Sequence, residues 1–273
     1  MKDVFQMAAG SVIGRSHLVS GKNNQDAYYV VVTENIIITI VCDGCSSGSH
    51  SEVGAKIGAR LIVEAMIRHL QGELLPDNFW EKVKQDVLEE LENLARSMGG
   101  IITQTVSDYF LFTVVGVLLT PTIATLFSWG DGVIIVNGEI LTNEIFPGNA
   151  PPYLGYGILA KNNISYITEN CHNFKINQQL PINEVESILI ATDGAIDLMK
   201  IGDRQLPGKS EIIGSISQFW QEEKYFKNPD NLRRKLALIN REITKLDKQS
   251  NQIIKEPGLL PDDTTLIVIK KAN

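Results

Sequence analysis

The sequence has few cysteines, little positive charge and no long apolar run, and each shortage excludes a class of protein. Three cysteines in 273 residues do not form a disulfide framework, and their odd number predicts a reducing compartment. The net charge of -7 gives no general attraction to nucleic acid or anionic lipid, so neither is an expected partner. No run of 18 apolar residues is present, which argues against a membrane span. No secretory signal precedes Ser11, and we therefore expect a cytoplasmic protein.

The remaining composition is that of an ordinary globular protein. Hydrophobic residues make up 44% of the chain and charged residues 21%, which is enough apolar material for a sizeable core. No repeat, low-complexity tract or linker divides the sequence. We therefore expect one domain over residues 1–273.

Runs rich in β-branched and aromatic residues predict strands in two main groups. The first group lies at 27–33 and 35–42, the second at 109–120, 123–129, 133–136 and 139–142, and later runs at 174–177, 187–192 and 264–270. The Asn137-Gly138 pair is a typical hairpin corner within the second group.

Apolar residues three or four positions apart predict helices between these groups. The pattern indicates helices over 51–70 and 78–97, and a third, long helix that runs from Leu232 to Leu246. Two β-rich blocks separated by two consecutive helices do not fit a strictly alternating βαβ fold. We predict an α+β fold, a four-layer α-β-β-α sandwich of two mainly antiparallel sheets flanked by helices.

The stretch 143–164 is rich in glycine, proline and asparagine and has little periodicity. Loops of this length inside a compact domain are often functional, so the segment is a candidate flap over a site. A surface loop without a role fits the same pattern.

Aspartate residues stand at the ends of five predicted strands. Asp43 and Asp193 directly follow apolar runs, Asp131 lies between two glycines, and Asp26 and Asp262 come just before strands. One Asp-Gly pair alone usually marks a turn. Five carboxylates at strand boundaries instead indicate a shared site.

The chemistry of such a site favours hard divalent cations. Mg²⁺ and Mn²⁺ bind oxygen ligands and keep several waters, so a few carboxylates are enough. The glycine after an aspartate lets the backbone approach closely and offers its carbonyl as a further ligand. Two ions about 3.5–4 Å apart can activate water and hold a phosphate for in-line attack.

These landmarks resemble, in order, those of the metal-dependent protein phosphatases of type 2C, over nearly the whole chain from Gly14 to Lys270. The matching motifs are Asn24-Gln25-Asp26-Ala27, Val41-Cys42-Asp43-Gly44, Trp129-Gly130-Asp131-Gly132, Ala191-Thr192-Asp193-Gly194 and Asp262-Asp263-Thr264-Thr265. Each motif is short, and the specificity comes from the order and spacing of all five.

The resemblance implies a role for each aspartate. Asp43 would bridge two ions, Asp193 and Asp262 would complete the shell of one, and the Gly44 carbonyl would bind the other. Asp26 would hold a metal-bound water. A third, looser ion would use Asp131 and Asp197. The family also implies two antiparallel sheets between helix pairs.

Three positions depart from the family pattern. Gln25 stands where an acidic residue is usual, Gly21 where a phosphate-binding arginine is usual, and Cys45 where a histidine is usual.

Nearby residues offer substitutes. The segment Gly14-Arg15-Ser16-His17 resembles a prokaryotic branch of the family with Ser-His upstream of Asn-Gln-Asp. His17 is a candidate proton donor because imidazole titrates near neutrality. Arg15 or Lys22 is a candidate phosphate ligand. A structural histidine and solvated surface charges are the alternatives.

The Cys42-x-x-Cys45 spacing also fits a redox pair or half of a zinc site. A zinc site needs two more ligands, for which only Cys171-His172 and His50 are candidates. We expect Cys42 to be packed at the end of its strand.

Together these observations predict a hydrolase of phosphoserine and phosphothreonine esters in phosphoproteins. The enzyme would use two Mn²⁺ or Mg²⁺ ions, or three if Asp131 and Asp197 bind a further ion. One alternative is a catalytically weak relative that binds metal or phosphoprotein as a regulatory module. The other is a metal phosphohydrolase for small molecules.

Overall fold

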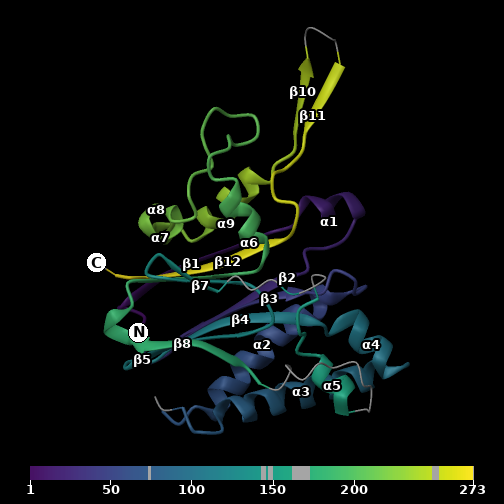
Figure 1. The fold of residues 1–273 in the computed structure, drawn as a ribbon, viewed down its shortest axis with the longest axis vertical. Helices are drawn as coiled ribbons and strands as arrows, with labels where there is room; N and C mark the ends of the chain where they lie inside the picture. The colour runs from purple at the N-terminus through teal and green to yellow at the C-terminus, as the bar shows by residue number, and fades with distance from the viewer. Residues whose placement is uncertain (73–74, 143–145, 147–149, 162–172, 248–251, 273) are drawn as a thin grey trace.

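The computed structural model describes residues 1–72, 75–142, 146, 150–161, 173–247 and 252–272. Two five-stranded antiparallel sheets pack on each other, and helices cover the outer face of each (Figure 1). This confirms the predicted α+β fold. Among the helices of the described residues, none has both the length and the apolar character needed to cross a bilayer.

Each sheet combines segments that are far apart in the sequence. One sheet has the order β1 (Phe5–Val12), β12 (Thr264–Lys271), β9 (Ser187–Ala191), β6 (Val133–Val136) and β7 (Glu139–Thr142). The other has the order β2 (Asp26–Val32), β3 (Ile37–Gly44), β4 (Phe112–Leu119), β5 (Ile123–Trp129) and β8 (Lys175–Pro181).

The inner faces of the two sheets form the central core. Val41 and Val115 of one sheet belong to the same buried cluster as Ile134, Ile190 and Ile267 of the other. Every residue of β4 is buried, because one face meets the opposite sheet and the other meets helices. This explains why β4 is a continuous apolar run without alternation.

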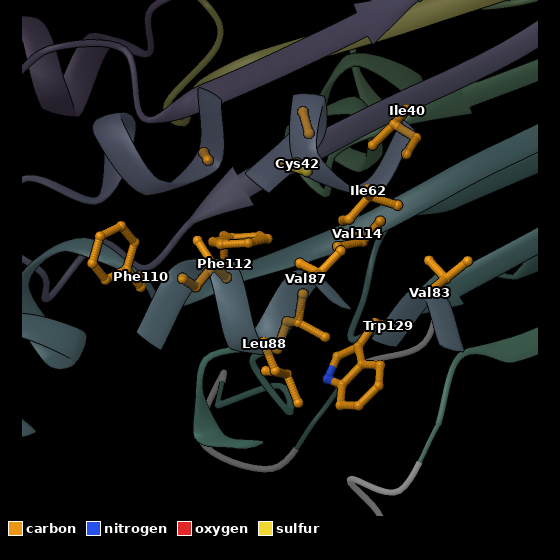
Figure 2. Close-up of a cluster of buried hydrophobic side chains, with 14 of the residues drawn as sticks. Ile40, Cys42, Ile62, Val83, Val87, Leu88, Phe110, Phe112, Val114 and Trp129 are labelled. Carbon is orange, nitrogen blue, oxygen red and sulfur yellow. The ribbon is translucent and has the colours of Figure 1, made fainter. Parts of the chain in front are cut away.

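One helical layer covers the β2–β3–β4 side. It contains α2 (Ser51–His69), α3 (Phe79–Met98), α4 (Ile102–Tyr109) and α5 (Tyr156–Lys161). Figure 2 shows part of its buried cluster, in which Ile62 of α2 and Val83 and Val87 of α3 group with Phe112 and Val114 of β4. Gly58 allows α2 to approach the sheet closely, since a Cβ there would lie 2.1 Å from the Phe112 ring.

The other outer layer is made of shorter elements. It contains α6 (Gly194–Lys200), α7 (Gln218–Gln221), α8 (Lys224–Lys227) and α9 (Asp230–Ile239). Phe219, Tyr225, Leu232 and Leu236 are fully buried against the β1–β12–β9 face. The short helix α1 (Arg15–Ser20) connects the two sheets.

The predicted long helix is wrong beyond Ile239. There the chain leaves the helix, and β10 (Ile243–Asp247) pairs with β11 (Gln252–Glu256) as a hairpin. The Asn240 side chain donates to the Ile13 carbonyl and accepts from the Leu260 N–H, which stabilises the turn. The spacing of Ile239 and Ile243 matched a helical period, but β-branched residues on both hairpin strands favour extended structure.

Helix α4 and strand β1 are among the elements that were not predicted. Helix α4 lies just before β4, so the strand begins at Phe112 rather than at residue 109. Strand β1 pairs along its whole length with β12, which is more than 250 residues away in the sequence. Only part of the predicted flap at 143–164 lies in the described residues, and it contains α5.

Candidate metal centre

The predicted aspartates come together at one end of the two packed sheets. Asp26 and Asp43 lie opposite each other in the β2–β3 pair. Asp193 lies two positions after the last residue of β9, and Asp262 lies two positions before the first residue of β12, the neighbour of β9. The Thr192 hydroxyl donates to Asp26 Oδ2 at 2.8 Å and so joins the two sheets at this point. Antiparallel pairing thus brings carboxylates from four chain segments to the same end of the two sheets.

A small pocket of about 40 Å³ opens between these strand ends. Five of the predicted metal ligands line it, together with the candidate proton donor: Asp43, Gly44, Asp131, Asp193, Asp262 and His17. Asp26 does not line this pocket, and its side chain is 4% exposed.

The carboxyl groups around the pocket destabilise one another's charged forms. Burial, and after it the nearby carboxylates, hold the pKa values of Asp26 and Asp43 well above the usual aspartate range. The pKa values of Asp193 and Asp262 are also raised, again mainly by burial. A cation bound among these groups would offset both causes.

Several buried oxygen atoms fit a bound cation or its waters. Within the described residues, Asp26 Oδ1, Asp193 Oδ1 and Gln25 Oε1 are buried and have no hydrogen-bond partner. Buried polar atoms without partners are rare in folded proteins. Carboxylate oxygens together with a backbone carbonyl form a donor set that suits Mn²⁺ or Mg²⁺.

Asp263, which the sequence analysis gave no role, organises the edge of the pocket. Its carboxylate accepts from the Gly14 N–H at 2.6 Å and the Gln25 N–H at 2.5 Å, and it is 2% exposed. His17 Nδ1 lies 2.9 Å from its Oδ2. The sequence signal for a separate role of Asp263 was the Asp262-Asp263 pair before the last strand. Successive side chains at the start of a strand can point to different sides, so the two aspartates can have different roles.

The backbone beside Asp263 is packed too closely to admit larger residues. A Cβ on Gly14 would lie 2.3 Å from the Asp262 carbonyl carbon, and one on Gly194 would lie 2.0 Å from the Asp263 carbonyl oxygen. These two glycines therefore set the position of the Asp262–Asp263 segment relative to α1 and α6.

Besides Asp26, the predicted site residues Arg15 and Asp197 also lie outside the pocket. Arg15, the first residue of α1, lines an adjacent groove, and its Nη1 donates to the Gly258 carbonyl at 3.1 Å. Asp197 lines the same groove, and its carboxylate accepts from Lys200 at 3.0 Å. By contrast, Lys22 donates to the carbonyl of Ser46, which lines the pocket.

Cys45 and Tyr153 also line the pocket. Cys45 Sγ lies 3.1 Å from the Ser47 hydroxyl. Burial, and then contact with Cys45, raises the pKa of Tyr153 above its ordinary value. Sequence analysis did not single out Tyr153, because the segment around it has no periodicity. Cys42 is fully buried in β3, as expected, whereas Cys171 and His172 lie outside the described residues.

The sequence pattern of a family described as Protein phosphatase 2C matches residues 13–237. The chain belongs to this family. No curated protein matches it. The family match agrees with the resemblance that the aspartate motifs show.

Solved structures show the same fold at low sequence identity. A bacterial serine phosphatase matches with 13% identity over 98% of each chain and a TM-score of 0.53. PppA of Pseudomonas aeruginosa, described as a key regulatory component of T6SS, matches with 14% identity over 98% of each chain and a TM-score of 0.50. At this identity the likeness supports the fold.

Proposed function

We propose that this protein is a metal-dependent serine/threonine protein phosphatase that hydrolyses phosphoserine and phosphothreonine esters with Mn²⁺ or Mg²⁺. The observation that carries the proposal is the meeting of Asp43, Asp193 and Asp262 in one pocket, with their pKa values raised. Membership of the protein phosphatase 2C family supports it.

Different residues of the pocket would hold each of the two ions. Asp43 lies within electrostatic reach of both Asp193 and Asp262 and is followed by Gly44, so it would help to hold both ions. Asp193 and Asp262 would complete one shell, and the Gly44 carbonyl would contribute to the other. When bound, the ions supply Lewis-acid activation of water and neutralise charge on the phosphate oxygens. Asp131 lines the pocket and remains a proposed ligand of a third ion, whereas Asp197 lines the adjacent groove and is paired with Lys200.

The chain's own groups would then orient water and handle protons. Asp26 carries a buried oxygen without a partner, which can hold a water in place for attack. His17 lines the pocket, and its Nδ1 lies 2.9 Å from Asp263 Oδ2; its imidazole is the proposed proton donor to the leaving alkoxide. Of the two candidate phosphate ligands, Lys22 contacts a pocket residue whereas Arg15 lies in the groove, which favours Lys22.

Hydrolysis of para-nitrophenyl phosphate and of a phosphothreonine peptide, with and without Mn²⁺, tests the proposal. We expect turnover that requires the metal and is lost in Asp43→Asn. Calorimetry with Mn²⁺ on the same samples separates binding from catalysis.

The departures at Gln25, Gly21 and Cys45 define the competing outcome. Mn²⁺ binding without turnover of either substrate would favour a regulatory binding module. Absence of both metal binding and turnover would refute the metal centre itself.

A further inference from the structure

A groove of about 750 Å³ lies next to the metal pocket, on the side of the hairpin. Its walls come from α1, α6, the segment 204–210, the hairpin and the segment that precedes β12. Figure 1 shows the hairpin β10–β11 projecting beyond the two sheets, with α6 and α1 near its base. The hairpin lies beyond residues 13–237, which match the family pattern.

Three chain segments contribute to both the groove and the metal pocket. Each has one residue in the groove and another in the pocket close by in sequence: Arg15 and His17, Asp197 and Asp193, and Pro261 and Asp262. The groove therefore adjoins the pocket in which the proposed function places the phosphate.

The groove is positively charged although the protein as a whole is acidic. Five cationic side chains and two carboxylates line it. The two carboxylates are already paired, Asp197 with Lys200 at 3.0 Å and Glu256 with Lys245 at 2.8 Å. The walls thus carry three positive charges beyond those balanced by the lining carboxylates.

Those three charges belong to Arg15, Arg204 and Lys209. In the part of the chain that the structure describes, none of them forms an ion pair with a carboxylate. Arg204 and Lys209 are exposed, so both can reach a ligand in the groove. Cationic groups on a surface that meets a partner attract acidic segments and select against basic ones.

Apolar side chains lie between the charges. Leu206, Pro207 and Leu259 line the groove. Ile254 is paired with Lys245 across the hairpin, so both side chains project from the same face, and Ile254 is 47% exposed. A groove of this volume, with apolar contacts and a few cations, suits a short peptide segment with acidic side chains.

We propose that this groove binds an acidic segment of the phosphoprotein substrate, adjacent to the phosphorylated residue. The inference rests on the proposed phosphatase function, because that function places the phosphate in the neighbouring pocket. It adds a substrate class to that function: phosphoserine and phosphothreonine sites flanked by aspartate or glutamate.

A charge-reversal variant, Arg204→Glu/Lys209→Glu, tests the proposal against a matched control, Lys227→Glu/Lys255→Glu. The control carries the same change in net charge, but Lys227 is exposed on α8 and Lys255 projects from the opposite face of the hairpin to Lys245. The substrates are para-nitrophenyl phosphate and phosphothreonine peptides with glutamate, alanine or lysine neighbours on both sides.

We expect the groove variant to lose about tenfold in kcat/KM on the glutamate peptide and to keep the wild-type value on para-nitrophenyl phosphate and the alanine peptide. The control variant should retain the wild-type preference for glutamate over lysine neighbours. Equal losses in both variants, or no preference in the wild type, would overturn the groove assignment.

Binding measurements distinguish failure of the groove from failure of the phosphatase function. If the wild type hydrolyses none of the substrates, fluorescence anisotropy with the labelled glutamate peptide still tests the groove. Tighter binding of the glutamate peptide than of the alanine peptide, lost only in the groove variant, would support binding of an acidic segment in the groove. Equal affinity for the two peptides would refute it. Equally tight binding of a single-stranded oligonucleotide, lost in the same variant, would replace the peptide assignment with general polyanion binding.

Discussion

The metal pocket and the basic groove are neighbours, yet they are built in opposite ways. The pocket is small and acidic, and its carboxylates are held at strand ends by hydrogen bonds between and within the two sheets. The groove is large and basic, and its walls are loops, helix ends and a projecting hairpin. Metal coordination needs atoms fixed to fractions of an ångström, whereas recognition of a flanking peptide tolerates adjustment. The comparison predicts that changes in the pocket affect chemistry, whereas changes in the groove affect substrate choice.

The largest expected effect comes from a neutral amide in place of one pocket carboxylate. Asp193→Asn should lower kcat on para-nitrophenyl phosphate at least about a hundredfold, because it removes a proposed metal ligand. Asp203→Asn, an exposed aspartate next to groove residue Arg204, is the matched control and should retain wild-type activity. Steady-state kinetics over a range of Mn²⁺ concentrations checks both, and near wild-type turnover of Asp193→Asn at saturating Mn²⁺ would contradict the assignment.

An intermediate effect, on stability, is expected from replacing Asp263, the buried hydrogen-bond acceptor at the edge of the pocket. Asp263→Ala should reduce the free energy of unfolding by about 3 kcal/mol, because the Gly14 and Gln25 N–H groups lose their acceptor in a buried place. Asp203→Ala should change it by less than about 0.5 kcal/mol. Urea denaturation of both variants measures the difference, and equal stabilities would show that Asp263 does not organise this edge.

The smallest expected effect is a gain in stability of the metal-free protein rather than a loss. The raised pKa of Asp43 means that the folded, metal-free protein binds protons more tightly than the unfolded chain. Its contribution therefore makes the metal-free protein less stable as the pH rises above about 4, the ordinary aspartate value. Asp43→Asn removes this contribution, so in EDTA at pH 7 the variant should be more stable than the wild type by about 1 kcal/mol.

Urea denaturation in EDTA between pH 5 and pH 8, at about one-unit intervals, tests this expectation. Saturating Mn²⁺ should reverse the order of stability, because only the wild type gains the full binding energy. A variant that is less stable than the wild type in EDTA at every pH would show that the Asp43 charge is already compensated in the metal-free protein.

The fold class and most of the pocket were predictable because they depend on local patterns. Each pocket aspartate adjoins an apolar strand, and a strand end has few possible neighbours in a two-sheet sandwich. Ile36 to Cys42 is apolar except for Thr39, and Ile188 to Ala191 is apolar throughout, which made the β3 and β9 ends easy to locate. The helices α2 and α3 were also correct to within one residue at their N-termini and C-termini.

Other features were not predictable because their partners are remote. Strand β1 has few β-branched residues and is stabilised by pairing with β12. The spacing of apolar residues from Ile239 to Leu246 favours a helix. The helix ends at Ile239 instead, because the Asn240 side chain bonds to the backbone of Ile13 and Leu260. Asp263 looked like a duplicate of Asp262, and only its buried contacts distinguish the two.

The sequence by itself determined the α+β class, the carboxylates at the strand ends and the family, because alternation, apolar runs and short motifs are local. The tertiary structure decided which of these residues share a pocket. It separated Arg15 and Asp197 from Asp43 and brought Arg15 together with Arg204 and Lys209. Such placements depend on the packing of α1, α6 and the hairpin. This packing results from contacts between residues more than 250 positions apart, which leave no periodic trace in the chain.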